Sequence, residues 1–234
     1  METGLLSVRI IVLLLSFVFG VYSNTGQAEN SACTQLDALN KKLADVFFNA
    51  EINCINQVLL KQQNQFKQNP ALLVDYVDQT LMPIWSSQTT LRLIFSAEYW
   101  SEFPDVDKIK LTTGFNNTLH RYVQEGFEHY EGQQIEYVGV RLNKNKNRGY
   151  LTVRVIPNVL PSFTIDFKIG LFDDSWKLYD AMIEGVSYVA LKKDSYQEKF
   201  EVGGIKAVID YFNEKNQGYL PSKLVMTNNT GLTD

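Results

Sequence analysis

The spacing of apolar residues changes once along the chain, from a helical period to a period of two. Before residue 130, apolar side chains recur at three- and four-residue intervals among polar ones, which is typical of helices with one buried stripe. Asn69 and Pro70 are well suited to begin the second of these helices, and Pro83 ends it. The helices predicted in this half of the chain span residues 51–66, 70–82, 87–100 and 105–130.

After Gly132 the apolar residues alternate with polar ones, which predicts β-strands. The clearest strand runs from Phe163 to Leu171 and places five apolar side chains on one face. Turn signals at 143–149, 157–161 and 173–174 divide the region into four strands with short links, so we expect an antiparallel meander. Two further helices follow, the second from Gly203-Gly204, and the fold class is therefore α+β.

Residues 1–28 have the pattern of a secretory signal peptide. The apolar run from Ile10 to Gly20 follows Arg9 and is too short to span a bilayer comfortably. Cleavage is expected after Ser23 or Ala28, and an uncleaved N-terminal anchor is the alternative. The parts expected after the signal are an N-terminal extension (29–50), one domain (51–216) and a flexible polar tail (217–234).

Composition narrows the class of protein. Apolar residues make up 45% of the chain, with 14 Phe and 12 Tyr, which is enough to fill a sizeable core. The formal net charge is −4, and no dense run of lysine and arginine is present. Nucleic acid is therefore not an expected partner.

Cys33 and Cys54 are the only cysteines. An even number of cysteines in an exported chain favours a disulfide. A single helix over residues 33–54 would instead hold them about 30 Å apart, far beyond the roughly 4.4–6.8 Å that a bridge needs between Cα atoms. Either the segment folds back and the bond forms, or both thiols stay free, and from the even count we predict the bond.

No constellation of catalytic or metal-binding residues is evident. His120 and His129 lie on opposite sides of one helix and cannot share a metal ion, so we interpret both as polar surface residues. Ser187 lacks the second glycine of a nucleophile elbow, and no histidine follows it. We interpret Asp180 and Glu184 as carboxylates that cap or bridge a strand-to-helix corner. We therefore predict that the protein is not an enzyme and binds no metal.

An ordered set of residues carries a family resemblance over residues 51–216. Its C-terminal part consists of Trp176, Tyr179-Asp180, Ile183 to Ser187 and Val189, followed by a charged helix and then Gly204-Ile205, Ile209 and Phe212. Its upstream part consists of Asn69-Pro70, Leu72-Leu73, Val77-Asp78, Leu81, Pro83, Trp100, Phe115, Leu119, Tyr122 and Gly132-Gln133. In order and spacing this set resembles the MlaC (toluene-tolerance) family. The segment 33–50, both cysteines and the tail after Gln217 depart from the family's pattern.

The resemblance implies a periplasmic phospholipid carrier without catalytic activity. Members of the family shuttle lipid between an outer-membrane lipoprotein MlaA complex and an inner-membrane ABC transporter that contains MlaD, and so maintain outer-membrane lipid asymmetry. The implied fold is a curved four-stranded antiparallel sheet, packed with N-terminal and C-terminal helices around an apolar pocket, similar to the NTF2-like arrangement. Phospholipid would then be cargo, with no cofactor, and the chain is expected to be a monomer.

The pocket is expected to have one wall on the apolar strand face and another on the long helix. The residues expected to line it are Trp85, Phe95, Trp100, Phe115, Leu119, Tyr122, Val153, Val155, Ile165, Phe167, Ile169, Tyr179, Ile183, Val186 and Val189.

Two alternatives from other classes stay open. One is an NTF2-like enzyme with a small polar site, which is disfavoured because the sheet face offers no inward-facing pair of histidine or aspartate. The other is a structural adaptor of the periplasm with a solid core, because a pattern of apolar residues does not separate a filled core from a lipid-lined cavity.

Overall fold

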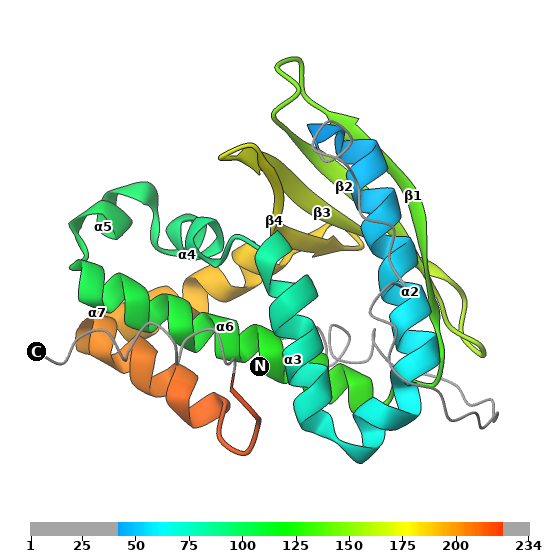
Figure 1. Cartoon of the computed structure of the whole chain (residues 1–234). Coiled ribbons are helices and arrows are strands. Elements are labelled where there is room, and N and C mark those ends of the chain that lie inside the picture. Colours follow the sequence, from blue (N-terminus) through cyan, green and yellow to red (C-terminus); the bar gives the residue numbers. More distant parts are fainter. Residues whose placement is uncertain (1–41, 222–234) are drawn as a thin grey trace, which may run out of the picture. The chain divides into compact units, whose positions relative to one another are not determined.

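The computed structural model describes residues 42–221, which form an α+β fold (Figure 1). The predicted signal peptide, the part of the predicted extension before residue 42 and the tail after residue 221 lie outside the described residues. Within residues 42–221, no helix combines the length and the apolar character needed to cross a membrane.

The predicted helices are present, with some changes at their ends. Pro70 begins a helix as expected, and the predicted boundary between residues 50 and 51 lies inside a continuous helix. The helical elements are α2 (Ala44–Gln68), α3 (Pro70–Thr80), the 3₁₀ helix η2 (Met82–Ile84), α4 (Ser87–Phe95), α5 (Ala97–Glu102), α6 (Asp105–Glu128) and α7 (Tyr188–Lys215).

The single helix predicted over 87–100 is wrong, because Ser96 divides it into α4 and α5. Ser96 has φ 75° and ψ 157°, which is far from helical geometry. Its hydroxyl accepts a hydrogen bond from the backbone N–H of Tyr99 at 3.4 Å and so caps the start of α5.

The strands form one open antiparallel sheet in the order β1-β2-β3-β4-β5, which is also their order along the chain. Residue pairing places Val153 of β2 opposite Ile165 of β3, and Leu151 opposite Phe167. The strands are β1 (Gln134–Leu142), β2 (Arg148–Ile156), β3 (Phe163–Phe172), β4 (Ser175–Ile183) and β5 (Val186–Ser187).

The sheet has one strand more than the four predicted. Glu184 and Gly185 have φ values of 51° and 80°, and two successive residues in the left-handed region make the tight turn of a two-residue hairpin. The chain therefore reverses after β4, and Val186 pairs with Ile183 and Ser187 with Met182. The predicted break at Gly185 is thus a hairpin turn that precedes α7.

The chain divides into two compact units, although no step in composition marks the division within the domain predicted over 51–216. Of the described residues, the first unit contains 42–69 together with Glu125–Trp176, and the second contains Pro70–Gln124 together with 177–221.

In the first unit, α2 packs along β1. The side-chain amide of Asn56 in α2 donates to the carbonyl of Ile135 at 2.6 Å and accepts from its N–H at 3.0 Å, which extends the hydrogen bonding of the sheet edge to the helix. Phe66 of α2 is buried and meets Phe127 edge-on, with ring centroids 5.7 Å apart. Apolar packing and paired backbone groups together fix α2 against the strands.

In the second unit, Phe212 of α7 packs against α6 at Gly114. A Cβ atom at residue 114 would lie 2.7 Å from the Phe212 ring, so the absence of a side chain allows the two helices to approach. Gly203 and Gly204 interrupt α7 with non-helical backbone angles, where the last helix was predicted to begin. Gly204 has φ 65° and ψ −164°, a region essentially limited to glycine.

Candidate functional site

The apolar side chains of β2 and β3 that were predicted to line a pocket lie on one face of the sheet in the first unit. Directly opposed residues share a face, and Val153 pairs with Ile165. Val155 lies two residues from Val153, and Phe167 and Ile169 follow Ile165 at the same spacing. The structure therefore brings these five predicted residues together.

Burial is uneven across this face. On β2, Val153 and Val155 are 3% and 4% exposed, and on β3 Ile169 is fully buried. Ile165 and Phe167 in the middle of β3 are only half-buried, although both are large and apolar. The face thus has a well-covered part on β2 and a partly uncovered part on β3.

The predicted pocket residues of the second unit fall into three groups by exposure. Val186 is 49% exposed at the start of β5, the most exposed of them. The half-buried group is Trp85, Trp100, Leu119, Tyr179 and Ile183. The buried group is Phe95, Phe115, Tyr122 and Val189.

Asp180 organises the corner between the sheet and α7. It is fully buried, and its carboxylate accepts hydrogen bonds from the Ser187 hydroxyl at 2.6 Å and from the N–H of Val189 at 3.0 Å. Ser187 in turn accepts from the N–H of Ala190 at 3.1 Å and is the N-cap of α7. The capping interpretation of Asp180 is confirmed, whereas Glu184 is exposed in the hairpin turn.

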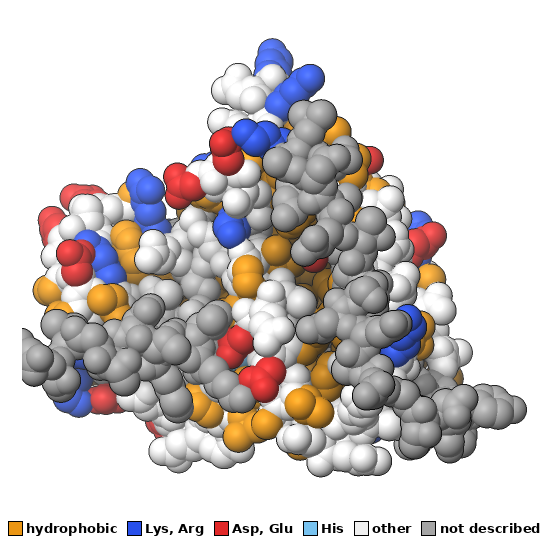
Figure 2. Space-filling model, in the orientation of Figure 1, with side chains coloured by type: hydrophobic (Ala, Val, Ile, Leu, Met, Phe, Trp, Pro, Cys, Tyr) orange, Lys and Arg blue, Asp and Glu red, His pale blue; other side chains and the backbone are white. Residues whose placement is uncertain are grey.

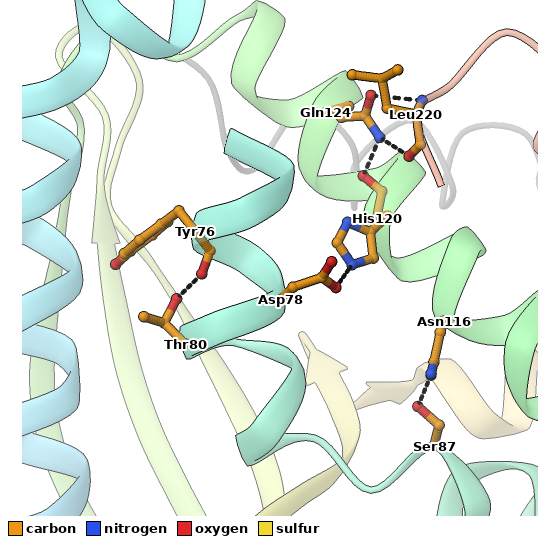
Figure 3. A network of polar contacts seen from close by, with 8 residues as sticks. All are labelled: Tyr76, Asp78, Thr80, Ser87, Asn116, His120, Gln124 and Leu220. Atoms are coloured by element: carbon orange, nitrogen blue, oxygen red, sulfur yellow. Dashed lines mark hydrogen bonds and ion pairs between the residues drawn. The ribbon is translucent and has the colours of Figure 1, made fainter. Parts of the chain in front are cut away.

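His120 is buried, so its interpretation as a surface residue is wrong. Its side chain is 1% exposed and its Nε2 lies 2.8 Å from Oδ1 of Asp78, which is 5% exposed (Figure 3). The pair joins α3 to α6 inside the second unit. One feature of the sequence could have indicated a buried polar pair: Asp78 lies on the apolar side of its helix, with Val74 and Val77. His129, by contrast, is exposed as predicted.

Other polar contacts around this pair fix the same helices. Ser87 at the start of α4 donates to the Asn116 side chain at 2.6 Å (Figure 3). Gln124 near the end of α6 accepts from the N–H of Leu220 at 3.1 Å and donates to its carbonyl at 2.9 Å. These contacts tie α4 and the segment after α7 to α6, which is a structural role.

Lowering the pH should destabilise the protein through His120. Burial lowers the pKa of His120 from its ordinary 6.5, and this effect outweighs the opposing influence of Asp78. The unfolded chain then takes up a proton near pH 6.5 while the folded chain takes it up only at lower pH. The free energy of unfolding therefore falls as the pH drops through this window, by at most about 1.4 kcal/mol per pH unit from this one group.

Urea denaturation at a series of pH values measures this effect. The stability difference between the wild type and His120→Gln should vary with pH below about 6.5. His129→Gln, at an exposed position near the end of the same helical region, is the matched control for the loss of a histidine side chain. Equal pH dependence in the wild type and His120→Gln would contradict the assignment.

Two basic side chains lie over buried tyrosines in the second unit. The guanidinium carbon of Arg121 is 4.7 Å from the ring centroid of Tyr122, and Nζ of Lys192 is 5.8 Å from that of Tyr188. Burial raises the pKa of Tyr188 well above its ordinary value and lowers the pKa of Lys192. The Tyr188 phenol therefore stays protonated at physiological pH and does not act as a base.

The described residues contain no group of three or more His, Cys, Asp or Glu side chains placed to hold a metal ion. Asp180, the one carboxylate at the predicted corner that is buried, uses its oxygens to hold the start of α7. The chemistry that these residues offer is packing, capping and apolar contact.

Cys54 lies in α2 and is disulfide-bonded. Its predicted partner, Cys33, lies outside the described residues. We expect thiol titration of the mature protein, unfolded without reductant, to find no free thiol, and reduction to release two. Two reactive thiols before reduction would contradict the predicted bond.

These features define an α+β protein with an open five-stranded antiparallel sheet, packed with helices and partly uncovered on one apolar face. The chain belongs to the MlaC family, whose model, described as MlaC protein, matches residues 50–214. The resemblance inferred from the sequence is thereby confirmed.

A solved structure supports the same fold. It is described as a phospholipid-binding protein from Ralstonia solanacearum in complex with a phospholipid. The two chains superimpose with a TM-score of 0.57 at 19% sequence identity, over 69% of this chain and 94% of the other.

Proposed function

We propose that the protein is a phospholipid carrier. The observation that carries the proposal is the half-buried state of Ile165 and Phe167 on an apolar face whose β2 side chains are buried. Membership of the MlaC family and the fold shared with a phospholipid-binding protein support acyl chains as the material that covers this face.

A phospholipid carrier must avoid the large free-energy cost of exposing acyl chains to water. Exposure of the roughly 30 methylenes of a diacyl lipid to water costs on the order of 24 kcal/mol, at about 0.8 kcal/mol for each methylene. Both acyl chains must therefore be buried during transfer. Apolar surface that is left partly uncovered in the protein without lipid is suited to this task, because lipid completes its burial.

The cellular role that we propose follows the family. The carrier works in the periplasm after export and moves phospholipid between an MlaA-containing outer-membrane complex and an ABC transporter with MlaD in the inner membrane. In this role phospholipid is cargo and no bond is made or broken, so no enzymatic activity is proposed. A monomer is sufficient for it.

A transfer assay between two vesicle populations tests this function. Purified protein should accelerate the movement of a labelled phospholipid from donor to acceptor vesicles, in proportion to its concentration. Protein unfolded by heat and an unrelated protein of similar charge are the controls. Transfer that stays at the spontaneous rate would contradict carriage.

A further inference from the structure

The hairpin that joins β1 to β2 carries an unusual local charge. Between residues 137 and 165 the sequence has five basic residues and no aspartate or glutamate. This stretch therefore carries a formal charge of +5, and because the whole chain carries −4, the remainder carries −9. Four of the five basic residues, Arg141, Lys144, Lys146 and Arg148, lie at the turn, and we call them the basic tip.

No carboxylate within the described part of the chain forms an ion pair with any residue of the basic tip, whereas Arg154, further along β2, pairs with Glu136 at 2.7 Å. Arg148 lies 4.2 Å from the centroid of the Phe172 ring and donates to the carbonyl of Leu171 at 3.2 Å. Ring and carbonyl contacts orient a guanidinium but do not supply an opposite charge, and among residues 42–221 no carboxylate supplies one to Arg148. Lys144 and Lys146 are exposed to solvent.

The turn that presents these charges is held in one conformation. The side-chain oxygen of Asn143 accepts from the N–H groups of Asn147 at 3.1 Å and Arg148 at 3.3 Å. The N–H of Asn143 donates to the carbonyl of Arg148 at 2.8 Å, and Lys146 adopts φ 54°. Figure 2 shows Lys and Arg side chains gathered at the end of this hairpin, at the top of the view.

We propose that the basic tip docks on the surface of an anionic lipid bilayer. A charged plane attracts clustered cations without needing shape complementarity, whereas a standard protein interface buries about 800 Å² on each partner, more than a hairpin turn offers. Leu142, next to Arg141 of the basic tip, is 38% exposed and adds apolar contact at the boundary of the bilayer. The choice of a lipid surface over an acidic protein rests on the proposed function.

The strength of this docking follows from the charges. Each lysine or arginine near an anionic membrane contributes about a fivefold gain in binding, and screening by salt removes it. Loss of both Lys144 and Lys146 should therefore weaken binding on the order of 30-fold. The effect requires an anionic surface and should be absent with neutral lipid.

Cosedimentation with vesicles tests the proposal on the full mature chain. The probes are vesicles of phosphatidylcholine alone and vesicles of phosphatidylcholine with phosphatidylglycerol in about equal amounts, at low and at high salt. The test variant is Lys144→Gln/Lys146→Gln. The matched control is Lys61→Gln/Lys193→Gln, which removes the same charge from exposed positions on α2 and α7.

The expected result is salt-sensitive binding of the wild type and of the control to the anionic vesicles only, and loss of that binding in the test variant. Equal binding by both double variants would overturn the proposal. No preference of the wild type for anionic vesicles would also overturn it, and would favour an acidic protein as the partner of the basic tip. Sedimentation does not depend on lipid transfer. Failure of the carrier function would therefore appear in the transfer assay alone.

Discussion

Replacing Phe167 with aspartate is expected to reduce bound phospholipid by at least about tenfold, while the lipid-free protein keeps its fold. Phe167 is half-buried on β3, directly opposite the buried Leu151. Without lipid, a carboxylate at this position keeps contact with water. Against acyl chains it would lose that hydration without gaining a partner, at a cost of several kcal/mol. Lipid quantification and circular dichroism of the same preparation measure both effects.

Two comparisons make this result interpretable. Thr164→Asp introduces the same charge at an exposed position on the opposite face of β3 and should leave bound lipid unchanged. Phe167→Ala should destabilise the lipid-free protein by less than Phe115→Ala, which truncates a fully buried ring and is expected to cost about 3–5 kcal/mol. Equal costs for the two alanine variants would mean that Phe167 belongs to a filled core, and the adaptor alternative would then gain support.

Asp180→Ala is expected to lower the free energy of unfolding by about 3–6 kcal/mol, from two hydrogen bonds to a carboxylate at about 1.5–3 kcal/mol each. The substitution removes the acceptor of the Ser187 hydroxyl and the Val189 N–H inside a corner from which water is excluded. Because Ser187 caps α7, the start of this helix should fray as well. Urea denaturation gives the stability, and hydrogen exchange at residues 188–191 reports the fraying.

Asp194→Ala is the control, because Asp194 is exposed on α7 and its loss should change stability by no more than about 0.5 kcal/mol. If Asp180→Ala lowers the free energy of unfolding as little as the control does, the Asp180 carboxylate is dispensable for stability. Bound lipid that disappears with no loss of stability would instead place Asp180 in direct contact with the cargo.

The strands were predictable because alternation depends only on which side chains face the interior. Phe163 to Leu171 alternates without exception, and β3 occupies this range in the structure. The helices were predictable from the three- and four-residue spacing of their apolar side chains. Pro70 begins α3, because the fixed φ of proline suits the first position of a helix. The capping role of Asp180 was also accessible, since an aspartate near the end of an apolar strand can accept hydrogen bonds from the first N–H groups of a following helix.

The features that the sequence did not reveal depend on single backbone angles or on packing between distant segments. The break at Ser96 requires a positive φ at a serine, and the fifth strand requires one at Glu184, residues for which such angles are uncommon. The burial of His120 depends on Asp78, 42 residues earlier, on another helix. Likewise, the half-buried state of Phe167 depends on what covers β3, which alternation alone does not determine.

Native mass spectrometry of the intact protein, purified from a bacterial periplasm without detergent, measures the cargo directly. We expect a species heavier than the mature chain by the mass of one or more phospholipids, and release of phospholipid when the complex is dissociated in the instrument. Phe167→Asp prepared in the same way should appear mainly at the mass of the mature chain. A wild-type protein that is folded and carries no phospholipid would contradict the proposal that this chain is a lipid carrier.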